Sequence, residues 1–269
     1  MTFSALAAAV ICSGSFPLFW FIPLTGIFCL AAGASVLNQV QEITIDGKMK
    51  RTLNRPLPGR RISPRNALIM GIAINVAGIL ILYLTKNLPC LLLGLLNIAW
   101  YNGLYTWLKK KTAFAVVPGA VTGAIPVLMG WSVAGGSLLR PEGYFLAFVV
   151  FVWQVPHFWL LMLSFGNQYL EAGLPSMMTL FSVPAMKRII LSWTIASSAA
   201  SLLLIFVRLV QWNITIYSLI LLNAFLIFLM IRTFFMKSSG SNRALFIAIN
   251  IFLMLFFIIL MADRVFILG

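Results

Sequence analysis

Long apolar segments separated by short polar ones fill this chain of 269 residues. A membrane-spanning helix needs about 20 apolar residues, and the polar breaks divide the chain into nine such candidates. The predicted limits are 2–16, 17–37, 65–85, 88–108, 113–134, 144–165, 189–209, 213–235 and 244–262. The alternation typical of membrane β-strands is absent, and a lipid-exposed backbone must satisfy its own hydrogen bonds. We therefore expect an all-α fold, a polytopic membrane bundle of about nine helices that forms a single membrane-embedded domain over 1–269.

The composition is that of a membrane protein, with 62% hydrophobic and 9% charged residues. The net charge of +14 does not predict a nucleic-acid partner, because the basic residues stand in short loops and no basic soluble domain presents them. Cys12, Cys29 and Cys90 are isolated in apolar segments, so we expect neither a disulfide nor a zinc site. The chain begins without a basic region or a cleavage site, so 1–16 is expected to be a short spanning segment and not a cleaved signal.

Basic residues are concentrated on alternate connections between the predicted spans. The connections after the second, fourth, sixth and eighth spans hold 15 of the 19 Lys and Arg residues: Lys48, Lys50, Arg51, Arg55, Arg60, Arg61, Arg65, Lys109, Lys110, Lys111, Lys187, Arg188, Arg232, Lys237 and Arg243. Positive loops stay in the cytoplasm. We expect a multi-pass protein of the inner (cytoplasmic) membrane, with its amino terminus inside and its carboxyl terminus outside. Orientation alone is an equally good explanation for most of these loops, but the seven charges of the first exceed what it needs.

Acidic residues are rare, and three of the five fall on the basic side. The five are Glu42, Asp46, Glu142, Glu171 and Asp263. Asn38, Glu42 and Asp46 are spaced i, i+4, i+8, so a continuing helix would place them on one face. Mg²⁺ usually takes one or two protein carboxylates and completes its shell with water and substrate phosphate. Arg51 and Arg55, about one turn further on, could hold those phosphate oxygens. The alternative is a helix end with ordinary solvated charges.

These residues also carry a family resemblance. The pattern Asn38-x-x-x-Glu42-x-x-x-Asp46-x-x-Met49-x-Arg51-Thr52-x-x-Arg55-Pro56-Leu57 resembles the first signature of the UbiA superfamily of membrane prenyltransferases. It is most similar to the protoheme IX farnesyltransferases, or heme O synthases, which usually have Asp at the position of Glu42. Further matches are Tyr105-Thr106-x-Leu108-Lys109-Lys110, Gly123-Ala124-Ile125-Pro126 and Trp153-Gln154-Val155-Pro156-His157-Phe158-Trp159. The resemblance covers roughly 25–180, and the last third matches only in its number of spans.

The resemblance implies transfer of a farnesyl group from farnesyl diphosphate to a vinyl group of heme b, with Mg²⁺ as cofactor, at the cytoplasmic side of the lipid bilayer. It implies a catalytic group of Asn38, Glu42, Asp46, Arg51 and Arg55, with Arg51, Arg55, Lys109 and Lys110 binding the diphosphate. The acceptor heme would contact Tyr105, Trp153, Gln154 and His157. His157, the only histidine, either contacts heme iron or hydrogen-bonds within a helix opened by Pro156, and both remain open.

The chain also departs from the family pattern. The family usually has an aspartate or an aspartate pair before the tyrosine at position 169, but this chain has Asn167 and Gln168 there, and a Thr-Lys-Pro-Arg-like segment before the first span is missing. Glu171 stands four residues after Asn167, so these two would partly substitute for the missing aspartates as metal ligands if the segment is helical. Two other functions stay open: a UbiA-type prenyltransferase with a quinone or chlorin-type acceptor, and a non-catalytic heme- or isoprenoid-binding membrane protein or transporter.

Overall fold

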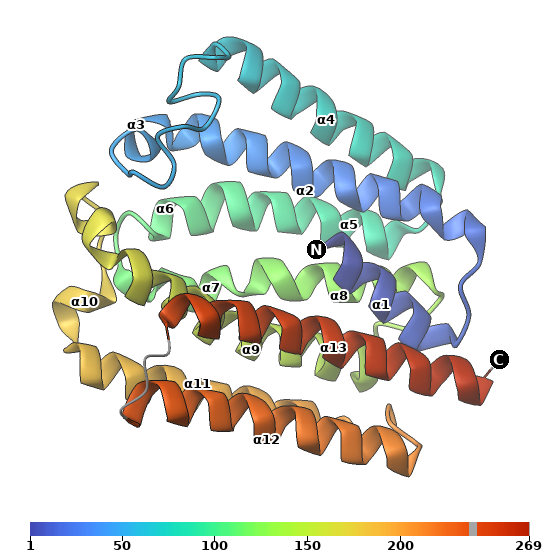
Figure 1. Cartoon of the computed structure of the whole chain (residues 1–269). Helices are drawn as coiled ribbons and strands as arrows, with labels where there is room; N and C mark the ends of the chain where they lie inside the picture. The colour runs from blue at the N-terminus through green and yellow to red at the C-terminus, as the bar shows by residue number, and fades with distance from the viewer. Residues whose placement is uncertain (237–240, 269) are drawn as a thin grey trace.

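Every regular element that the structure describes is helical, which confirms the all-α prediction (Figure 1). The computed structural model describes residues 1–236 and 241–268. Within these ranges nine long helical segments correspond in order to the nine predicted spans. They are α1 (Thr2–Ser13), α2 (Phe21–Gln41, preceded by η1, Leu18–Trp20), α4 (Pro64–Leu84), α5 (Leu88–Ile98, continued by η2, Ala99–Tyr105, and α6, Thr106–Leu108), α8 (Val121–Val133, preceded by η3, Ala113–Ala115, and α7, Val116–Gly119), α9 (Pro141–Glu171), α11 (Val183–Leu203), α12 (Asn213–Phe235) and α13 (Asn242–Leu268). Two short helices, α3 (Ile43–Asp46) and α10 (Met177–Leu180), lie in connections.

Seven of the described helical segments are long and apolar enough to cross a membrane: 18–41, 64–84, 88–108, 113–133, 141–171, 213–235 and 242–266. The chain is therefore an integral membrane protein. The 12 residues of α1 span about 18 Å, too short to cross a hydrocarbon core of about 30 Å alone. Large apolar side chains such as Leu80, Leu221 and Phe225 are more than half exposed, at 54%, 71% and 57%, as expected for helix faces that contact lipid.

Several helix boundaries differ from the sequence prediction by three to six residues, and two of these differences have a clear local cause. The span predicted at 144–165 continues to Glu171, because nothing breaks the helix before Gly173, whose φ of 80° is left-handed. The span predicted at 189–209 begins six residues earlier, because Pro184 lies in the first turn of α11 and Ser182 is extended. Lys187 and Arg188, expected in a loop, therefore lie within α11.

The helix predicted to continue through Asn38, Glu42 and Asp46 is interrupted. Helix α2 ends at Gln41, and Glu42 leaves the helical region with φ −120° and ψ 13°. The chain then resumes helical geometry in α3, which ends at Asp46. Because of this interruption, Asp46 does not follow Asn38 on one continuous helix face, and its direction is set by α3 instead.

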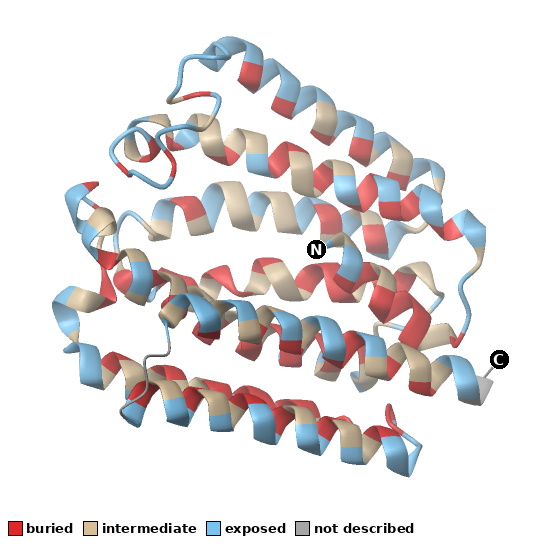
Figure 2. Ribbon diagram, viewed as in Figure 1, coloured by how far each residue is buried: buried red, intermediate tan, exposed pale blue. Residues whose placement is uncertain are grey.

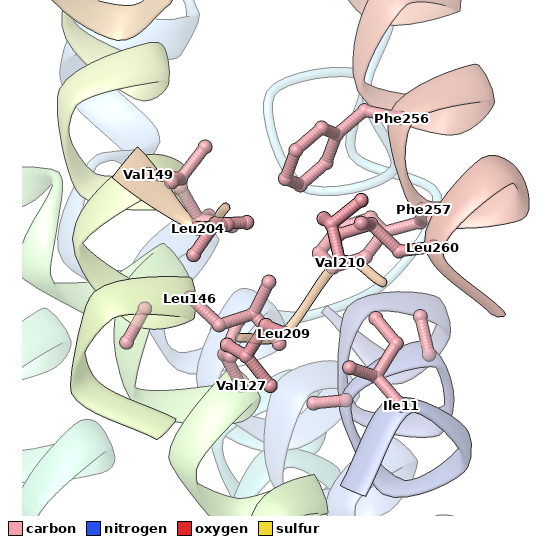
Figure 3. Close-up of a cluster of buried hydrophobic side chains, with 14 of the residues drawn as sticks. Ile11, Val127, Leu146, Val149, Leu204, Leu209, Val210, Phe256, Phe257 and Leu260 are labelled. Carbon is pink, nitrogen blue, oxygen red and sulfur yellow. The ribbon is translucent and has the colours of Figure 1, made fainter. Parts of the chain in front are cut away.

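The helices bury their inner faces in three apolar clusters, and Figure 2 shows buried residues facing inward and exposed residues on the outer faces of α4 and α12. The cluster in Figure 3 joins α1, α8, α9, α13 and the connection after α11, through Ile11, Val127, Leu146, Leu209 and Phe256. Close helix contact is the main source of stability where lipid is as apolar as the core. At the α2–α4 contact, a side chain at Gly33 would overlap Asn75.

The connections after α2, α6 and α9 lie at one end of the bundle, and the carboxyl terminus and the α1–α2 connection lie at the other (Figure 1). The first of these ends, here called the basic end, carries most of the Lys and Arg residues counted from the sequence. Lys237 lies outside the described residues. Lys86, Arg140, Arg208 and Arg264 stand on the connections or helix end at the opposite end.

Candidate functional site

A cavity of about 250 Å³ opens at the basic end of the bundle. We call it the polar cavity, and its walls come from the end of α2, from α3 and the loop after it, from η2, from the segment between α6 and α7, and from α9 and the connection after it. Its polar and aromatic lining residues include Asn38, Glu42, Asp46, Arg51, Arg55, Tyr101, Tyr105, Lys109 and Tyr169. The structure thus gathers most of the residues predicted to bind a metal and a diphosphate.

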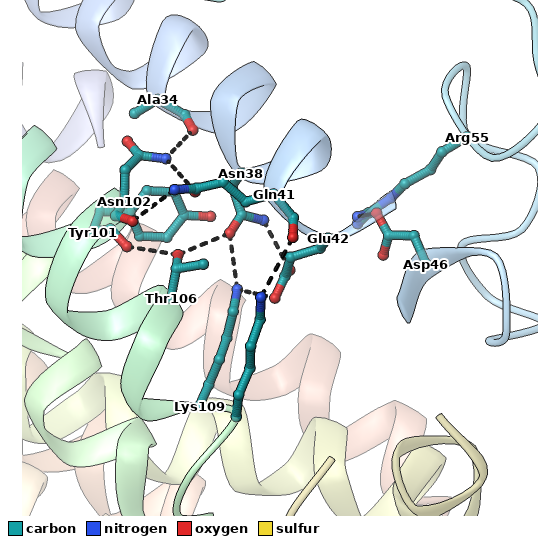
Figure 4. Close-up of polar contacts among 11 residues, drawn as sticks. Ala34, Asn38, Gln41, Glu42, Asp46, Arg55, Tyr101, Asn102, Thr106 and Lys109 are labelled. Atoms are coloured by element: carbon teal, nitrogen blue, oxygen red, sulfur yellow. Dashed lines mark hydrogen bonds and ion pairs between the residues drawn. The ribbon is translucent and has the colours of Figure 1, made fainter. Parts of the chain in front are cut away.

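Both carboxylates of the polar cavity are buried and paired with a cation (Figure 4). Glu42 is 8% exposed, and its Oε1 lies 2.7 Å from Lys109 Nζ. Asp46 is 3% exposed, and its Oδ2 lies 2.8 Å from Arg55 Nη1. Burying a charge is costly unless it is paired and hydrogen-bonded. The two ion pairs therefore offset part of the cost of burying these carboxylates at the edge of an apolar bundle.

Asn38 connects the two sides of the cavity. Its Nδ2 donates to Glu42 Oε2 over 3.1 Å, while its Oδ1 accepts from Lys109 Nζ at 2.8 Å and from the Thr106 hydroxyl at 3.1 Å (Figure 4). Thr106 is not among the site residues predicted from the sequence. It stands three residues before Lys109, and this spacing puts both on one helix face, which is the signal that could have found it.

The wall opposite α2 is a π-helix, η2, which carries Tyr101 and Tyr105. Their rings stack with centroids 5.8 Å apart, and Lys109 Nζ lies 5.0 Å from the Tyr105 centroid. π-Helical turns are rare and occur frequently at functional sites. Burial lowers the pKa of Lys109 from its ordinary value, and the neighbouring Glu42 carboxylate opposes that shift. The site thus holds a desolvated ammonium between a carboxylate and an aromatic face.

The other predicted diphosphate ligands are placed differently. The backbone N–H of Arg51 donates to Gln168 Oε1 over 3.2 Å, and its guanidinium lies 5.7 Å from the Phe165 ring centroid. These contacts dock the loop after α3 against the end of α9. Lys110 is exposed, does not line the polar cavity, and its Nζ lies 3.5 Å from the carbonyl of Gln41. A cation there complements the negative end of the α2 dipole.

The structure does not bring Asn167 and Glu171 into the polar cavity. Both are exposed, and Asn167 borders a separate crevice with Met178. Tyr169 lines the polar cavity, and residues two positions away point about 200° round the helix. The segment is helical, as the prediction required. Asn167 and Glu171, however, lie on the helix face that points away from the polar cavity.

The donors that remain fit one hard cation. In the described part of the chain, no three His, Cys, Asp or Glu side chains gather as a metal site. Asn38, Glu42 and Asp46 line one cavity and offer amide and carboxylate oxygens, which suit a Mg²⁺ ion that completes its shell with water and phosphate. Two carboxylates are too few for a second ion held by protein alone.

A second cavity of about 200 Å³ lies between α2, α5, α8 and α9, and we call it the apolar cavity. Tyr101 and Phe158 line both cavities, so they form the boundary between them. Asn97 and Gln154 also line the apolar cavity, each four residues before one of these rings. Their side-chain oxygens are buried and have no hydrogen-bond partner among the described residues. Buried amides without partners are costly, so this cavity is suited to a mainly apolar ligand with a polar group.

Trp153 and His157 do not line either cavity. The His157 ring packs between Trp153 and Phe246, with centroids 4.8 Å from each, and Trp153 Nε1 donates to the carbonyl of Ile249 over 2.9 Å. These two residues join α9 to α13. They stand one position before Gln154 and Phe158, which is about 100° round the helix. A role for them in acceptor binding stays a prediction.

The fold and the site together define an integral membrane protein with a buried acid–base cavity at one end of a helical bundle. The sequence profile of the UbiA prenyltransferase family matches residues 1–259. The chain belongs to this family.

Curated relatives of the chain are protoheme IX farnesyltransferases. The protein from Oleidesulfovibrio alaskensis is 43% identical over 150 residues, which is 56% of this chain and 53% of that protein. The chain thus aligns with about half the length of this relative. The protein from Bdellovibrio bacteriovorus is 31% identical over 253 residues, 90% of this chain and 82% of that protein.

Solved structures share the fold. A UbiA homologue from Archaeoglobus fulgidus, bound to GPP and Mg²⁺, matches with a TM-score of 0.68 at 14% identity. The match covers 98% of this chain and 95% of the homologue. At this identity the likeness establishes the fold alone.

Proposed function

We propose that the chain, as a single membrane domain over 1–269, transfers a farnesyl group from farnesyl diphosphate to a vinyl group of heme b, giving heme O. The observation that carries the proposal is the polar cavity, in which two buried carboxylates, Glu42 and Asp46, are paired with Lys109 and Arg55. The names of the relatives supply the donor and the acceptor. The solved homologue, which binds a prenyl diphosphate with Mg²⁺, supports the same class of donor.

The polar cavity can assist departure of a diphosphate. In the first step the bond between the farnesyl C1 and oxygen breaks, and the electron pair leaves with the diphosphate. Arg51, Arg55 and Lys109 line the cavity and would neutralise that anion. Asn38, Glu42 and Asp46 would hold Mg²⁺, which when bound adds Lewis-acid stabilisation of the leaving group.

The aromatic boundary suits the allylic cation that remains. The stacked rings of Tyr101 and Tyr105 line the polar cavity, with the Tyr105 ring beside Lys109, and would shield an allylic cation from water. The vinyl group of the acceptor then forms the new carbon–carbon bond, and water adds to the adjacent carbon and loses a proton. Gln154 would contact the acceptor from the apolar cavity.

We further propose that the protein lies in the inner (cytoplasmic) membrane with the basic end, and so the polar cavity, in the cytoplasm. The amino terminus would be inside and the carboxyl terminus outside, following the bias of positive loops. A reporter fused after Gly269 tests the orientation, since alkaline phosphatase is active only outside the cytoplasm. A fusion active as a cytoplasmic fluorescent protein instead would contradict the proposed orientation.

The function is tested with membranes from cells that express the chain, supplied with heme b, farnesyl diphosphate and Mg²⁺. Heme O, identified by its mass, is the expected product, and the Glu42→Gln, Asp46→Asn double variant should lose it while a Glu142→Gln control at the opposite end keeps it. Prenylation only of a quinone or chlorin from an acceptor panel would replace the proposed acceptor. Retained heme binding with no product from any acceptor would favour the non-catalytic alternative.

A further inference from the structure

The ammonium of Lys109 occupies the oxygens that a metal ion would need. Its Nζ lies 2.7 Å from Glu42 Oε1 and 2.8 Å from Asn38 Oδ1 (Figure 4). The Thr106 hydroxyl also lies 3.1 Å from the Asn38 oxygen, but its single proton is shared with the Tyr101 carbonyl at 2.8 Å. The ammonium therefore lies where an ion shared by Glu42 and Asn38 would have to lie, and the two oxygens cannot ligate a common metal ion until Lys109 leaves.

The position of Lys109 is built into the fold. Residue 109 follows directly after α6, its backbone N–H donates to the carbonyl of Tyr105 at 3.0 Å, and its side chain is 16% exposed. The Tyr105 ring adds a second attraction for the ammonium, 5.0 Å away. A lysine held by a carboxylate, an amide and an aromatic face is a resident cation and not a solvated surface charge.

Asp46, the other carboxylate of the site, is held more openly. Its partner Arg55 lies in the loop after α3, and the Arg55 side chain is 35% exposed. Lys109 is therefore the more buried of the two cations, and the one in contact with two of the three proposed metal ligands.

We infer that Lys109 is an internal counter-ion that excludes a divalent cation from Asn38 and Glu42 until a diphosphate enters. The arriving anion offers the ammonium new oxygens within the same cavity, so Lys109 moves to the diphosphate and frees both ligands. Metal and ammonium cannot occupy the position between these two oxygens together, because they would overlap and like charges repel. The metal then binds together with the diphosphate and not before it. The inference rests on the diphosphate and metal site of the proposed function.

The test measures Mn²⁺ binding to the purified full chain in detergent, without any prenyl substrate. The electron paramagnetic resonance signal of free Mn²⁺ gives the fraction that is not bound. The Lys109→Met variant should bind Mn²⁺ at least about tenfold more tightly than the unaltered protein, because a nearby positive charge is removed. Lys109→Arg keeps the charge and should bind weakly. Lys111→Met, an exposed neighbour, is the matched control and should not differ from the unaltered protein.

Inorganic pyrophosphate provides the second arm. It should strengthen Mn²⁺ binding by the unaltered protein more than binding by Lys109→Met, in which the ligands are already free. Adding Glu42→Gln and Asp46→Asn to Lys109→Met should abolish the increase in Mn²⁺ affinity. Lys109→Gln replaces Lys109→Met in the test if the methionine variant does not give a monodisperse protein.

The inference is overturned if Lys109→Met binds Mn²⁺ no more tightly than the unaltered protein. It is also overturned if the tighter Mn²⁺ binding remains after both carboxylates are removed. Because the readout is metal binding, it is separate from the function proposed above. The predicted Mn²⁺ pattern without any prenylated product would remove the enzymatic proposal and leave the counter-ion in place.

Discussion

Arg55 reaches back nine residues along the chain, and its Nη1 donates to Asp46 Oδ2 over 2.8 Å. This ion pair ties the loop after α3 to the end of α3. Both side chains line the polar cavity, so the same guanidinium neutralises a buried carboxylate and lies beside the proposed diphosphate site. A single side chain thus links the fold of this loop to its chemistry.

Replacing Arg55 should therefore weaken donor use strongly. We expect Arg55→Ala to lower kcat/KM for farnesyl diphosphate about 100-fold, since removal of one charge-stabilising donor typically costs that much. The kcat/KM of Arg55→Lys should lie between those of Arg55→Ala and the unaltered protein, because an ammonium keeps the charge but loses the planar, two-pronged geometry of the guanidinium. Lys50→Ala, in the same loop and exposed, is the control. Initial rates against farnesyl diphosphate concentration measure this, and equal rates for Arg55→Ala and Lys50→Ala would contradict it.

Local spacing was enough to predict part of this site. Asn38, Glu42 and Asp46 were predicted to share a site from their i, i+4, i+8 pattern, and the structure places them in one cavity, although the helix between them breaks at Glu42. Lys109 lies 71 residues from Asn38, and only the family resemblance indicated it. Spacing along a chain cannot show which distant helix faces a given residue.

Helix rotation explains the other differences. Gln154 and His157 belong to one sequence motif, but only Gln154 faces a cavity, since the intervening rotation turns His157 toward α13. In the same way Tyr169 faces the polar cavity while Asn167 and Glu171 do not. The sequence predicts that such segments are helical, but the direction of each face depends on packing against the rest of the bundle.

Gln154 offers a test that separates stability from function. Its buried Oε1 has no partner among the described residues, so Gln154→Leu should leave stability unchanged or raise it by about 1 kcal/mol. The same variant should raise KM for the acceptor several-fold while KM for the donor stays the same. Thermal unfolding in detergent and steady-state kinetics measure the two effects.

Gly123→Ala is the companion variant, because a methyl group there would overlap Gln154 Oε1 and displace that side chain. It should also raise KM for the acceptor. Unchanged acceptor kinetics in both variants would remove Gln154 from the acceptor site.

Trp153 should act in packing. Its Nε1 donates to the carbonyl of Ile249 at 2.9 Å, so Trp153→Phe removes a buried hydrogen bond between α9 and α13. We expect a loss of about 1 kcal/mol in the free energy of unfolding, seen as a lower Tm, with KM for both substrates unchanged. A raised acceptor KM at unchanged Tm would instead support the role in acceptor binding that the family resemblance implies.

Asp263 stabilises the end of the bundle opposite the polar cavity. It is 1% exposed, and its two carboxylate oxygens accept from the backbone N–H groups of Gln211 at 3.2 Å and Trp212 at 3.1 Å, just before α12. An anion at the amino end of a helix also complements the helix dipole.

The Asp263→Ala variant should lose about 2 kcal/mol of stability, because two backbone donors lose a charged acceptor. Asp263→Asn keeps one oxygen and should lose about half of that. Since the site lies at the other end of the bundle, kcat per folded molecule should not change in either variant. Thermal unfolding and activity normalised to monodisperse protein measure both quantities, and a fall in kcat at unchanged Tm would show that Asp263 acts on the reaction itself.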